Sequence, residues 1–566
     1  MHILMGTLAE SSTLRLDVNP LDYAILGIYF AVVITIGLVA RRSIATSEDF
    51  FLSGRSLPAW ITGLAFISAN LGAIEILGMA ANGAQYGAST VHFYWIGAVP
   101  AMVFLGLFMM PFYYSSRVHS VPEYMRRRFN APTHFVNALS FAAAQLLTAG
   151  VNLYALSIVI RSLLGWPQWL AIVISALFVL AYITLGGLSG AIYNEVLQFF
   201  VILAGLIPIV VIGLNKVGGW NGLQQKVNKP EFFSTWTGTG VGHWSNPLGD
   251  WIGIVFGLGF ALSFGYWTTN FAEVQRALSA KDLSAARRTP LIGAIPKIFI
   301  PFLTIVPGLI AIVLVPSFTQ PNPTYNDAIP LLMRQLLPNG VLGVALTGLL
   351  AAFMAGMAAN VSGFNTVFTY DLWRPYVVKD RSDRYYLNVG RIATVFGVLI
   401  GIGTAFIAST FSNIMNYIQS LFSYFNAPLF AVFILALFWK RATPWAGFYG
   451  LIAGILGAFA FHYIGPNLSY FYAGQTRSGG AAVNDQLVNF YGAICAVLVA
   501  WLVMLVVSTV TRPKPVEELL GLVWGEPDPN GPDVNAAKRA ATWWQSPALL
   551  GYGALAVTAV LSVIFL

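Results

Sequence analysis

Residues 57–82 read LPAWITGLAFISANLGAIEILGMAAN, a stretch that is apolar enough to cross a bilayer and yet contains Glu75. A carboxylate in hydrocarbon costs several kcal/mol, so it is retained where it faces a partner or a water-filled path. Gly72 interrupts the stretch, and Ser68 and Asn70 add polar groups before the glutamate. Broken helices with polar residues at mid-depth are typical of carriers, because unwound backbone offers dipoles and carbonyls to ions and substrates. We therefore predict a broken membrane-spanning helix here.

The composition of the whole chain agrees with a membrane protein. Of 566 residues, 57% are hydrophobic and 9% are charged, whereas soluble domains carry about 25% charged residues. The net charge of +8 resides mostly in loops, which indicates lipid headgroups and topology rather than nucleic acid. The single cysteine excludes internal disulfides and multi-cysteine metal sites. The chain shows no zinc, P-loop or nucleophile motif, so we predict neither an enzyme nor a cofactor.

A membrane span needs about 20 apolar residues. On this criterion we predict an all-α polytopic protein with about fourteen membrane-spanning helices, at 22–40, 57–82, 90–113, 134–163, 167–186, 191–214, 250–270, 291–315, 337–370, 392–410, 412–438, 444–465, 487–509 and 547–566.

The basic residues predict the orientation of these spans. Every second loop lies on the same side of the membrane, and the loops of one side hold 22 of the 30 Lys and Arg residues. Positively charged loops stay in the cytoplasm. This predicts a multi-pass protein of the cell membrane with both termini outside. The inward segment 510–546 is rich in proline and is expected to be a partly ordered linker.

Two further spans carry polar groups at depth. The seventh predicted span ends with Ser263, Tyr266, Trp267, Thr268, Thr269 and Asn270, and the sixth carries Glu195. Glu195 has two equal interpretations. It acts as a cation relay, or it is a charge that stabilises the N-terminus of a helix. The two aromatic residues either stack on a sugar ring or only pack.

Three more polar residues lie in or beside apolar segments, and each has two interpretations. Glu75 is a solute or proton ligand, or a hydrogen-bonded acid that holds helices together. Lys297 is a cavity ligand, or a side chain that extends to the membrane interface. Gln419 offers two donors and two acceptor lone pairs, which suit a hydroxylated solute or an interhelical hydrogen bond.

Several motifs in order resemble the solute:sodium symporter family, most closely its sodium/glucose and sodium/galactose branch. They span roughly residues 20–465 and are Asp49-Phe50-Phe51-Leu52-Ser53-Gly54-Arg55, Ser120-Val121-Pro122-Glu123-Tyr124, Gly186-Gly187-Leu188-Ser189-Gly190 with Glu195-Val196-Leu197-Gln198, Gln275-Arg276-Ala277-Leu278, Asn365-Thr366-Val367-Phe368-Thr369-Tyr370-Asp371 and Phe438-Trp439-Lys440-Arg441.

The resemblance implies a LeuT-like core of two inverted five-helix repeats, with one extra helix before it and three after it. The tail and extra helix then occupy residues 1–56, and the ten-helix transport core occupies 57–438. Its repeats are 57–214 and 250–438, and the C-terminal helices with linker 510–546 occupy 439–566.

The resemblance also places the sugar pocket of the family, whose residues fall on Asn70, Glu75, Tyr94, Gly97, Ser263, Lys297 and Gln419. Tyr266, beside Trp267, takes the place of the inner gate. Glu75 stands where a glutamine is usual, Tyr94 where a glutamate is usual, Gly97 in place of a serine, and Ser263 in place of an asparagine.

The sodium site that the resemblance implies maps to Ser68, Leu71, Ala355, Ala358 and Ala359. Hydroxyl-bearing residues are usual at the last two positions, and sodium, a hard cation, prefers oxygen ligands. We therefore expect a degenerate cation site. Glu195 stands where an aspartate lies near a second cation position, and it could bind a proton instead, together with Glu75.

We expect a secondary transporter that imports a small polar solute, most simply a sugar, by cation-coupled alternating access. Sodium is the coupling ion of the family, and a proton-coupled or uncoupled transporter is the alternative. A channel would need rings of polar residues rather than isolated ones, and a sensor would need an output domain. The expected partners are the solute, the coupling cation and the lipid bilayer.

Overall fold

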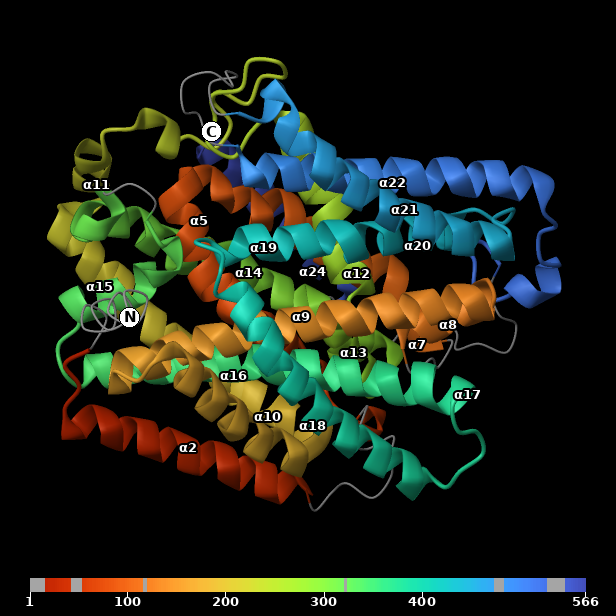
Figure 1. Cartoon of the computed structure of the whole chain (residues 1–566), viewed down its shortest axis with the longest axis horizontal. Coiled ribbons are helices and arrows are strands. Elements are labelled where there is room, and N and C mark those ends of the chain that lie inside the picture. Colours follow the sequence, from red (N-terminus) through yellow and green to blue (C-terminus); the bar gives the residue numbers. More distant parts are fainter. Residues whose placement is uncertain are drawn as a thin grey trace, which may run out of the picture.

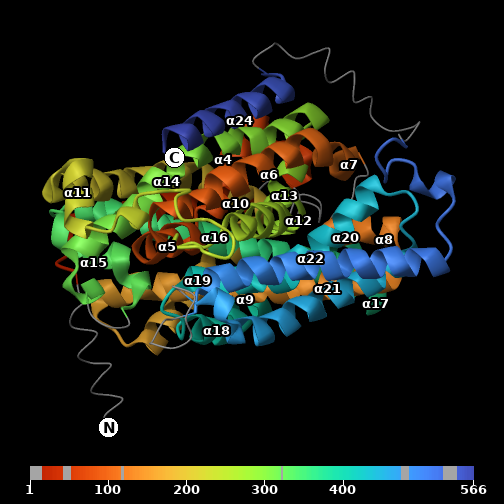
Figure 2. The same ribbon diagram turned by 90° about the horizontal axis from the view of Figure 1, so that it is seen from above.

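The computed structural model describes residues 16–41, 53–115, 120–319, 323–472, 483–526 and 545–565. Helices make up nearly all of this structure (Figures 1 and 2), and two isolated β-bridges are the only extended pairings within these ranges. The predicted all-α class is therefore confirmed.

The predicted spans correspond to the apolar helices. Eleven helices in the described part of the chain are long and apolar enough to cross a membrane, and a bent pair makes up to twelve. Two shorter apolar helices, Gln168–Leu177 and Gly253–Thr269, cover the fifth and seventh predicted spans. One boundary differs. The helix α10 (Gln168–Val217) continues through the loop that the sequence predicted at 187–190, where glycine and serine without proline leave the helix unbroken.

The second span is broken, as predicted. Helix α4 (Ala59–Asn70) and the following helical segments η2 (Ile74–Gly78) and α5 (Met79–Tyr86) meet at a bend of 57°. Asn152 of α9 (Ala131–Leu164) lies at the break, where its Oδ1 accepts a hydrogen bond of 3.0 Å from the Ala73 N–H. A Cβ at Gly72 would lie only 2.8 Å from that oxygen. Glycine therefore leaves room for the Asn152 side-chain amide, whose oxygen accepts the backbone N–H that the interrupted helix leaves without a partner.

The seventh span ends at a second interruption of the helix. It consists of η7 (Gly253–Ser263) and α12 (Phe264–Thr269), and α13 (Phe271–Leu278) follows after one residue. That residue, Asn270, has an extended backbone with φ −70° and ψ 107°. Its side-chain oxygen accepts a hydrogen bond from the Ala272 N–H at 3.1 Å and so caps α13.

Other core helices surround these breaks. They are α14 (Leu283–Leu314), α16 (Val341–Val367), α18 (Asp383–Ala408), α19 (Ile414–Leu421), its continuation η11 (Phe422–Asn426) and α20 (Ala427–Phe438). Figure 2 shows α12, α13 and α16 near the centre of the molecule, enclosed by longer helices on both sides. The two breaks are thus shielded from the lipid.

Four helices lie outside the predicted core: α2 (Pro20–Arg41), α21 (Pro444–Ile464), α22 (Asp485–Val510) and α24 (Pro547–Ile564). Figure 1 shows α2 along one edge, next to α10 and α16. Asp22 of α2 is fully buried, and its Oδ1 accepts hydrogen bonds of 2.7 Å from the N–H groups of both Gly340 and Gly343. A side chain of the extra helix thereby caps the first turn of α16. Of the linker predicted at 510–546, residues 527–544 lie outside the described structure.

Candidate functional site

A small cavity lies where the broken second span meets the seventh span. Its walls include six of the seven residues predicted for the solute pocket and both predicted gate residues. Its volume is about 50 Å³, which is room for a few water molecules. The lining residues are Asn70, Ile74, Glu75, Met79, Phe93, Tyr94, Ala98, Leu262, Ser263, Tyr266, Trp267, Lys297, Met415, Gln419 and Phe422.

A buried ion pair lies in the wall of the cavity. The Lys297 Nζ lies 2.8 Å from the Glu75 Oε1, and it also donates a hydrogen bond to the Asn70 Oδ1. Both charged residues are at most 4% exposed. Lys297 therefore does not extend to the membrane interface, and that interpretation of its sequence position is wrong. Since these are the only charged groups among the lining residues of the described structure, the cavity wall has no net charge.

The ion pair accounts for two departures from the pattern of the family. The resemblance places a glutamine at position 75 and a glutamate at position 94, and this chain has Glu75 and Tyr94 instead. Both side chains lie next to Lys297, whose Nζ is 5.0 Å from the centre of the Tyr94 ring. In this chain the carboxylate beside Lys297 therefore comes from position 75, and the residue at position 94 also lies beside that lysine. The Tyr94 hydroxyl is hydrogen-bonded to that of Thr304 at 2.8 Å.

Tyr266 closes one side of the cavity. Its ring packs against that of Phe422, with 4.8 Å between the centroids, and edge-on against Trp267. Its hydroxyl accepts a hydrogen bond of 3.1 Å from the Asn70 Nδ2 and donates one of 2.7 Å to the Glu273 Oε1. The ring is thus held by contacts to α4, η11 and α13 at once.

Gln419 and Ser263 complete the predicted lining, whereas Gly97 does not reach the cavity. Gln419 is 3% exposed, and its Oε1 has no hydrogen-bond partner within the part of the chain that the structure describes. A buried acceptor without a partner costs about 1–3 kcal/mol, so this oxygen is available to a hydroxyl donor. A Cβ at Gly97 would collide with the Ser263 Oγ, so glycine at this position leaves room for that serine.

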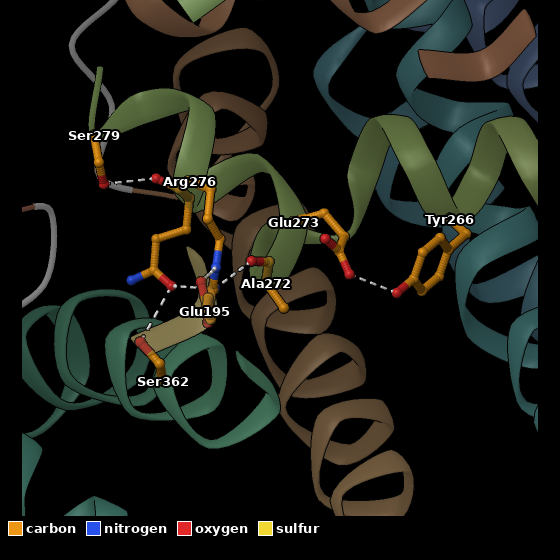
Figure 3. A network of polar contacts seen from close by, with 8 residues as sticks. Glu195, Tyr266, Ala272, Glu273, Arg276, Ser279 and Ser362 are labelled. Atoms are coloured by element: carbon orange, nitrogen blue, oxygen red, sulfur yellow. Dashed lines mark hydrogen bonds and ion pairs between the residues drawn. The ribbon is translucent and has the colours of Figure 1, made fainter. Parts of the chain in front are cut away.

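Glu195 belongs to a second polar cluster (Figure 3). It lies well inside α10, so the helix N-terminal interpretation does not apply. Its carboxylate accepts two hydrogen bonds from Arg276, of 2.5 and 3.2 Å, and neither residue is more than 1% exposed. Arg276 also donates to the Ala272 carbonyl at 2.6 Å. The cluster therefore joins α10 to α13 through a buried ion pair.

Comparison with known proteins identifies the family of the chain. The family model of the sodium:solute symporter family matches residues 50–454. The chain belongs to the sodium:solute symporter family. It is a transporter and not an enzyme, and sodium is the coupling ion for which this family is named.

Individual relatives agree with this result. The sodium/glucose cotransporter of Vibrio parahaemolyticus is 28% identical over 457 residues, which cover 77% of this chain and 84% of that protein. The sodium/myo-inositol cotransporter 2 of Oryctolagus cuniculus is 29% identical over 543 residues, 90% of this chain and 79% of that protein. A Na⁺-coupled sialic acid symporter in a substrate-bound, outward-open state superimposes with a TM-score of 0.72 at 19% identity, over 88% of this chain and 99% of that one. This likeness confirms the predicted LeuT-like fold.

The predicted cation site of this symporter has few side-chain oxygens. Ala355, Ala358 and Ala359 are buried and contribute none, whereas Ser68 is fully buried with an Oγ that lacks a hydrogen-bond partner among the described residues. Leu71 is also fully buried beside the helix break.

The α16 atoms nearest to Gly72 belong to Gly356 and Ala352, in the same part of that helix as the predicted cation-site residues. A Cβ at Gly72 would lie 3.2 Å from the Cα of Gly356 and 3.7 Å from the Ala352 carbonyl. These two residues have no side-chain oxygen either. The nearest side-chain oxygen is that of Asn152, which already accepts the Ala73 N–H.

The sequence did not single out Glu273 of the symporter. It is 2% exposed and is joined to the gate by the bond from Tyr266. The seventh predicted span ends at Asn270, and the apolar helix ends at Thr269, so Glu273 fell into a predicted loop. Its position three residues after the polar end of the seventh span was the only sequence signal.

Proposed function

We propose that this symporter imports a neutral, hydroxylated solute, a sugar or a related polyol, by alternating access with sodium as the coupling ion. The unpartnered, buried Gln419 Oε1 in a cavity lined by Asn70, Tyr266 and Trp267 is the observation that carries this proposal. An amide oxygen accepts hydrogen bonds from solute hydroxyls. An indole or phenol ring offers a flat face to the apolar side of a sugar ring.

The charges of the cavity favour a neutral solute over an anion. A carboxylate would need an unpaired cation, and Lys297 is already paired with Glu75. Two relatives are named for the transport of glucose and myo-inositol, both of which are uncharged and rich in hydroxyl groups. By contrast, the sialic acid symporter supports the fold of this chain and not its solute.

The mechanism that we propose uses both breaks. The core 57–438 is divided into the repeats 57–214 and 250–438, and the cavity lies between the second span and the seventh span. A cavity of about 50 Å³ is too small for a hexose, so the helix bundles rock apart to admit the solute from outside. Tyr266 then releases its contacts with Asn70 and Phe422 to open the path to the cytoplasm.

A proton, or no ion at all, is the second candidate for the coupling ion. The specific observation is the absence of side-chain oxygens at Ala355, Ala358 and Ala359, together with the occupation of the break by Asn152. Glu195, the residue of the predicted second site, is neutralised by Arg276. With this arrangement, sodium binding would rest mainly on backbone carbonyls and Ser68.

The test is uptake of radiolabelled glucose, myo-inositol and sialic acid into proteoliposomes, with external sodium or choline and with or without a pH gradient. We expect uptake of a neutral member of this panel and not of the acid. Strict sodium dependence supports the first candidate, whereas unchanged uptake in choline supports the second. Selective uptake of sialic acid would contradict the proposed solute class.

A further inference from the structure

One buried carboxylate lines the cavity and two more lie in the neighbouring helices, and two of the three are paired with buried cations of the described structure. Glu75 is paired with Lys297, and Glu195 is paired with Arg276. Glu273 is the third carboxylate, and no Lys or Arg of the described structure forms an ion pair with it. An uncompensated buried charge costs several kcal/mol. Glu273 therefore needs another positive partner during at least part of the transport cycle.

The hydrogen bonds of Glu273 are also incomplete. Its Oε1 accepts the bond from the Tyr266 hydroxyl, as Figure 3 shows, and its Oε2 is buried with no hydrogen-bond partner among the described residues. A glutamate in the first turn of a helix often bonds back to the N-cap N–H. Here the N-cap N–H, that of Asn270, is donated to the Tyr266 carbonyl at 3.0 Å. Helix capping therefore does not explain this glutamate.

We propose that Glu273 is a proton-binding site of the symporter and that its proton controls the Tyr266 gate. When Glu273 is ionised, it accepts a charge-assisted hydrogen bond from the Tyr266 hydroxyl and holds the gate closed. When it is protonated, the bond is between neutral groups and is roughly half as strong. The gate then opens more readily toward the cytoplasm. Proton binding stands on the structure alone, whereas the link to solute release rests on the proposed function.

The surroundings of Glu273 agree with a proton that binds near neutral pH. Burial raises the pKa of Glu273 to about 7, and the nearby Arg276 opposes this shift. The titratable groups that face it are Tyr266 of α12, Arg276 of α13, Glu195 of α10 and Lys297 of α14. The helices α4 and α16 also pack on α13, and neither carries an Asp, Glu, Lys, Arg or His residue. The tyrosines of α7 (Met110–Ser115) complete the neighbourhood.

Infrared difference spectroscopy tests proton binding without any solute. Purified protein is compared at about pH 6 and about pH 8, and the carbonyl band of a protonated carboxyl group is followed. We expect a band that appears on acidification in the wild type, persists in the exposed control Glu517→Gln, and is absent in Glu273→Gln. A band of equal size in Glu273→Gln would overturn the proposal.

Solute exchange in proteoliposomes tests the link to the gate. With equal pH and equal solute on both sides, acidification from about pH 8 to about pH 6 should raise the wild-type exchange rate about fivefold, as expected for loss of a charge-assisted bond. Glu273→Gln should exchange at the fast rate at both pH values, and Tyr266→Phe should also lose the pH dependence. Glu517→Gln should behave as the wild type.

The outcomes separate the two proposals. If no solute of the panel is exchanged by the wild type, the proposed function fails, and the infrared band still decides proton binding. If the band depends on Glu273 while Glu273→Gln keeps the wild-type pH profile of exchange, the link between the proton and the gate is refuted.

Discussion

The pairing of Glu75 with Lys297 predicts that the carboxylate can be moved to position 94, which also lies beside the lysine. Glu75→Gln alone leaves the lysine buried without its carboxylate partner at 2.8 Å. Removing one partner of a buried pair costs about 3–5 kcal/mol. Adding Tyr94→Glu returns a carboxylate to the neighbourhood of the Nζ, which lies 5.0 Å from the Tyr94 ring centre.

The double exchange should restore part of the lost stability. It loses the hydrogen bond between Tyr94 and Thr304, about 1 kcal/mol, and some ring packing. We therefore expect the double variant to recover about half of the loss or more. Its thermal unfolding midpoint in detergent should lie between those of the wild type and Glu75→Gln.

The matched control is Glu75→Gln with Tyr94→Gln, which changes the same positions and adds no charge. The assay is thermal unfolding followed by size-exclusion chromatography, with solute uptake as a second measurement. The control should be no more stable than Glu75→Gln. If the control and the Tyr94→Glu exchange unfold at the same temperature, a mobile carboxylate beside Lys297 is not the reason for this pair of residues.

Other predictions concern the solute ligand, the second ion pair and the helix break. Gln419→Ala should lower uptake about tenfold through loss of a hydrogen bond to the solute, with unchanged membrane abundance. The control Gln224→Ala, at an exposed position, should have no effect. Equal uptake by the two variants would show that Gln419 is not a solute ligand. Arg276→Met should destabilise the protein by about 3–5 kcal/mol because it leaves Glu195 unpaired, and adding Glu195→Gln should recover most of this loss in thermal unfolding; additive losses would contradict the pairing. Asn152→Ala should destabilise by about 1–3 kcal/mol because the Ala73 N–H loses its acceptor, and Asn152→Asp, which keeps an oxygen there, should unfold at a higher temperature than the alanine variant.

The sequence predicted the positions of the helices well because hydropathy alone determines which segments enter the lipid. The second span was expected to break near Gly72, and the structure has its bend there. The prediction of a loop at 187–190 was wrong because its two glycines were interpreted as the end of a helix. Without proline, nothing in that stretch removes a backbone hydrogen bond.

The candidate site was predictable residue by residue, but the contacts within it were not. Glu75 and Lys297 were both singled out as buried charges, yet their pairing depends on how α14 packs against η2, which no local pattern encodes. Glu273 was missed for a different reason. Hydropathy places it beyond the seventh span, whereas the fold returns α13 to the interior, where the residue meets Tyr266.

The contact between Asp22 and the start of α16 has a consequence for the movement of the molecule. The helix α2 lies outside both repeats, but two main-chain amides of a core helix depend on its carboxylate. Asp22 is fully buried, so no solvent contact replaces that acceptor in this structure. A rearrangement that moves α16 away from α2 would break both of these hydrogen bonds. We therefore expect the leading helix to move together with α16 during transport.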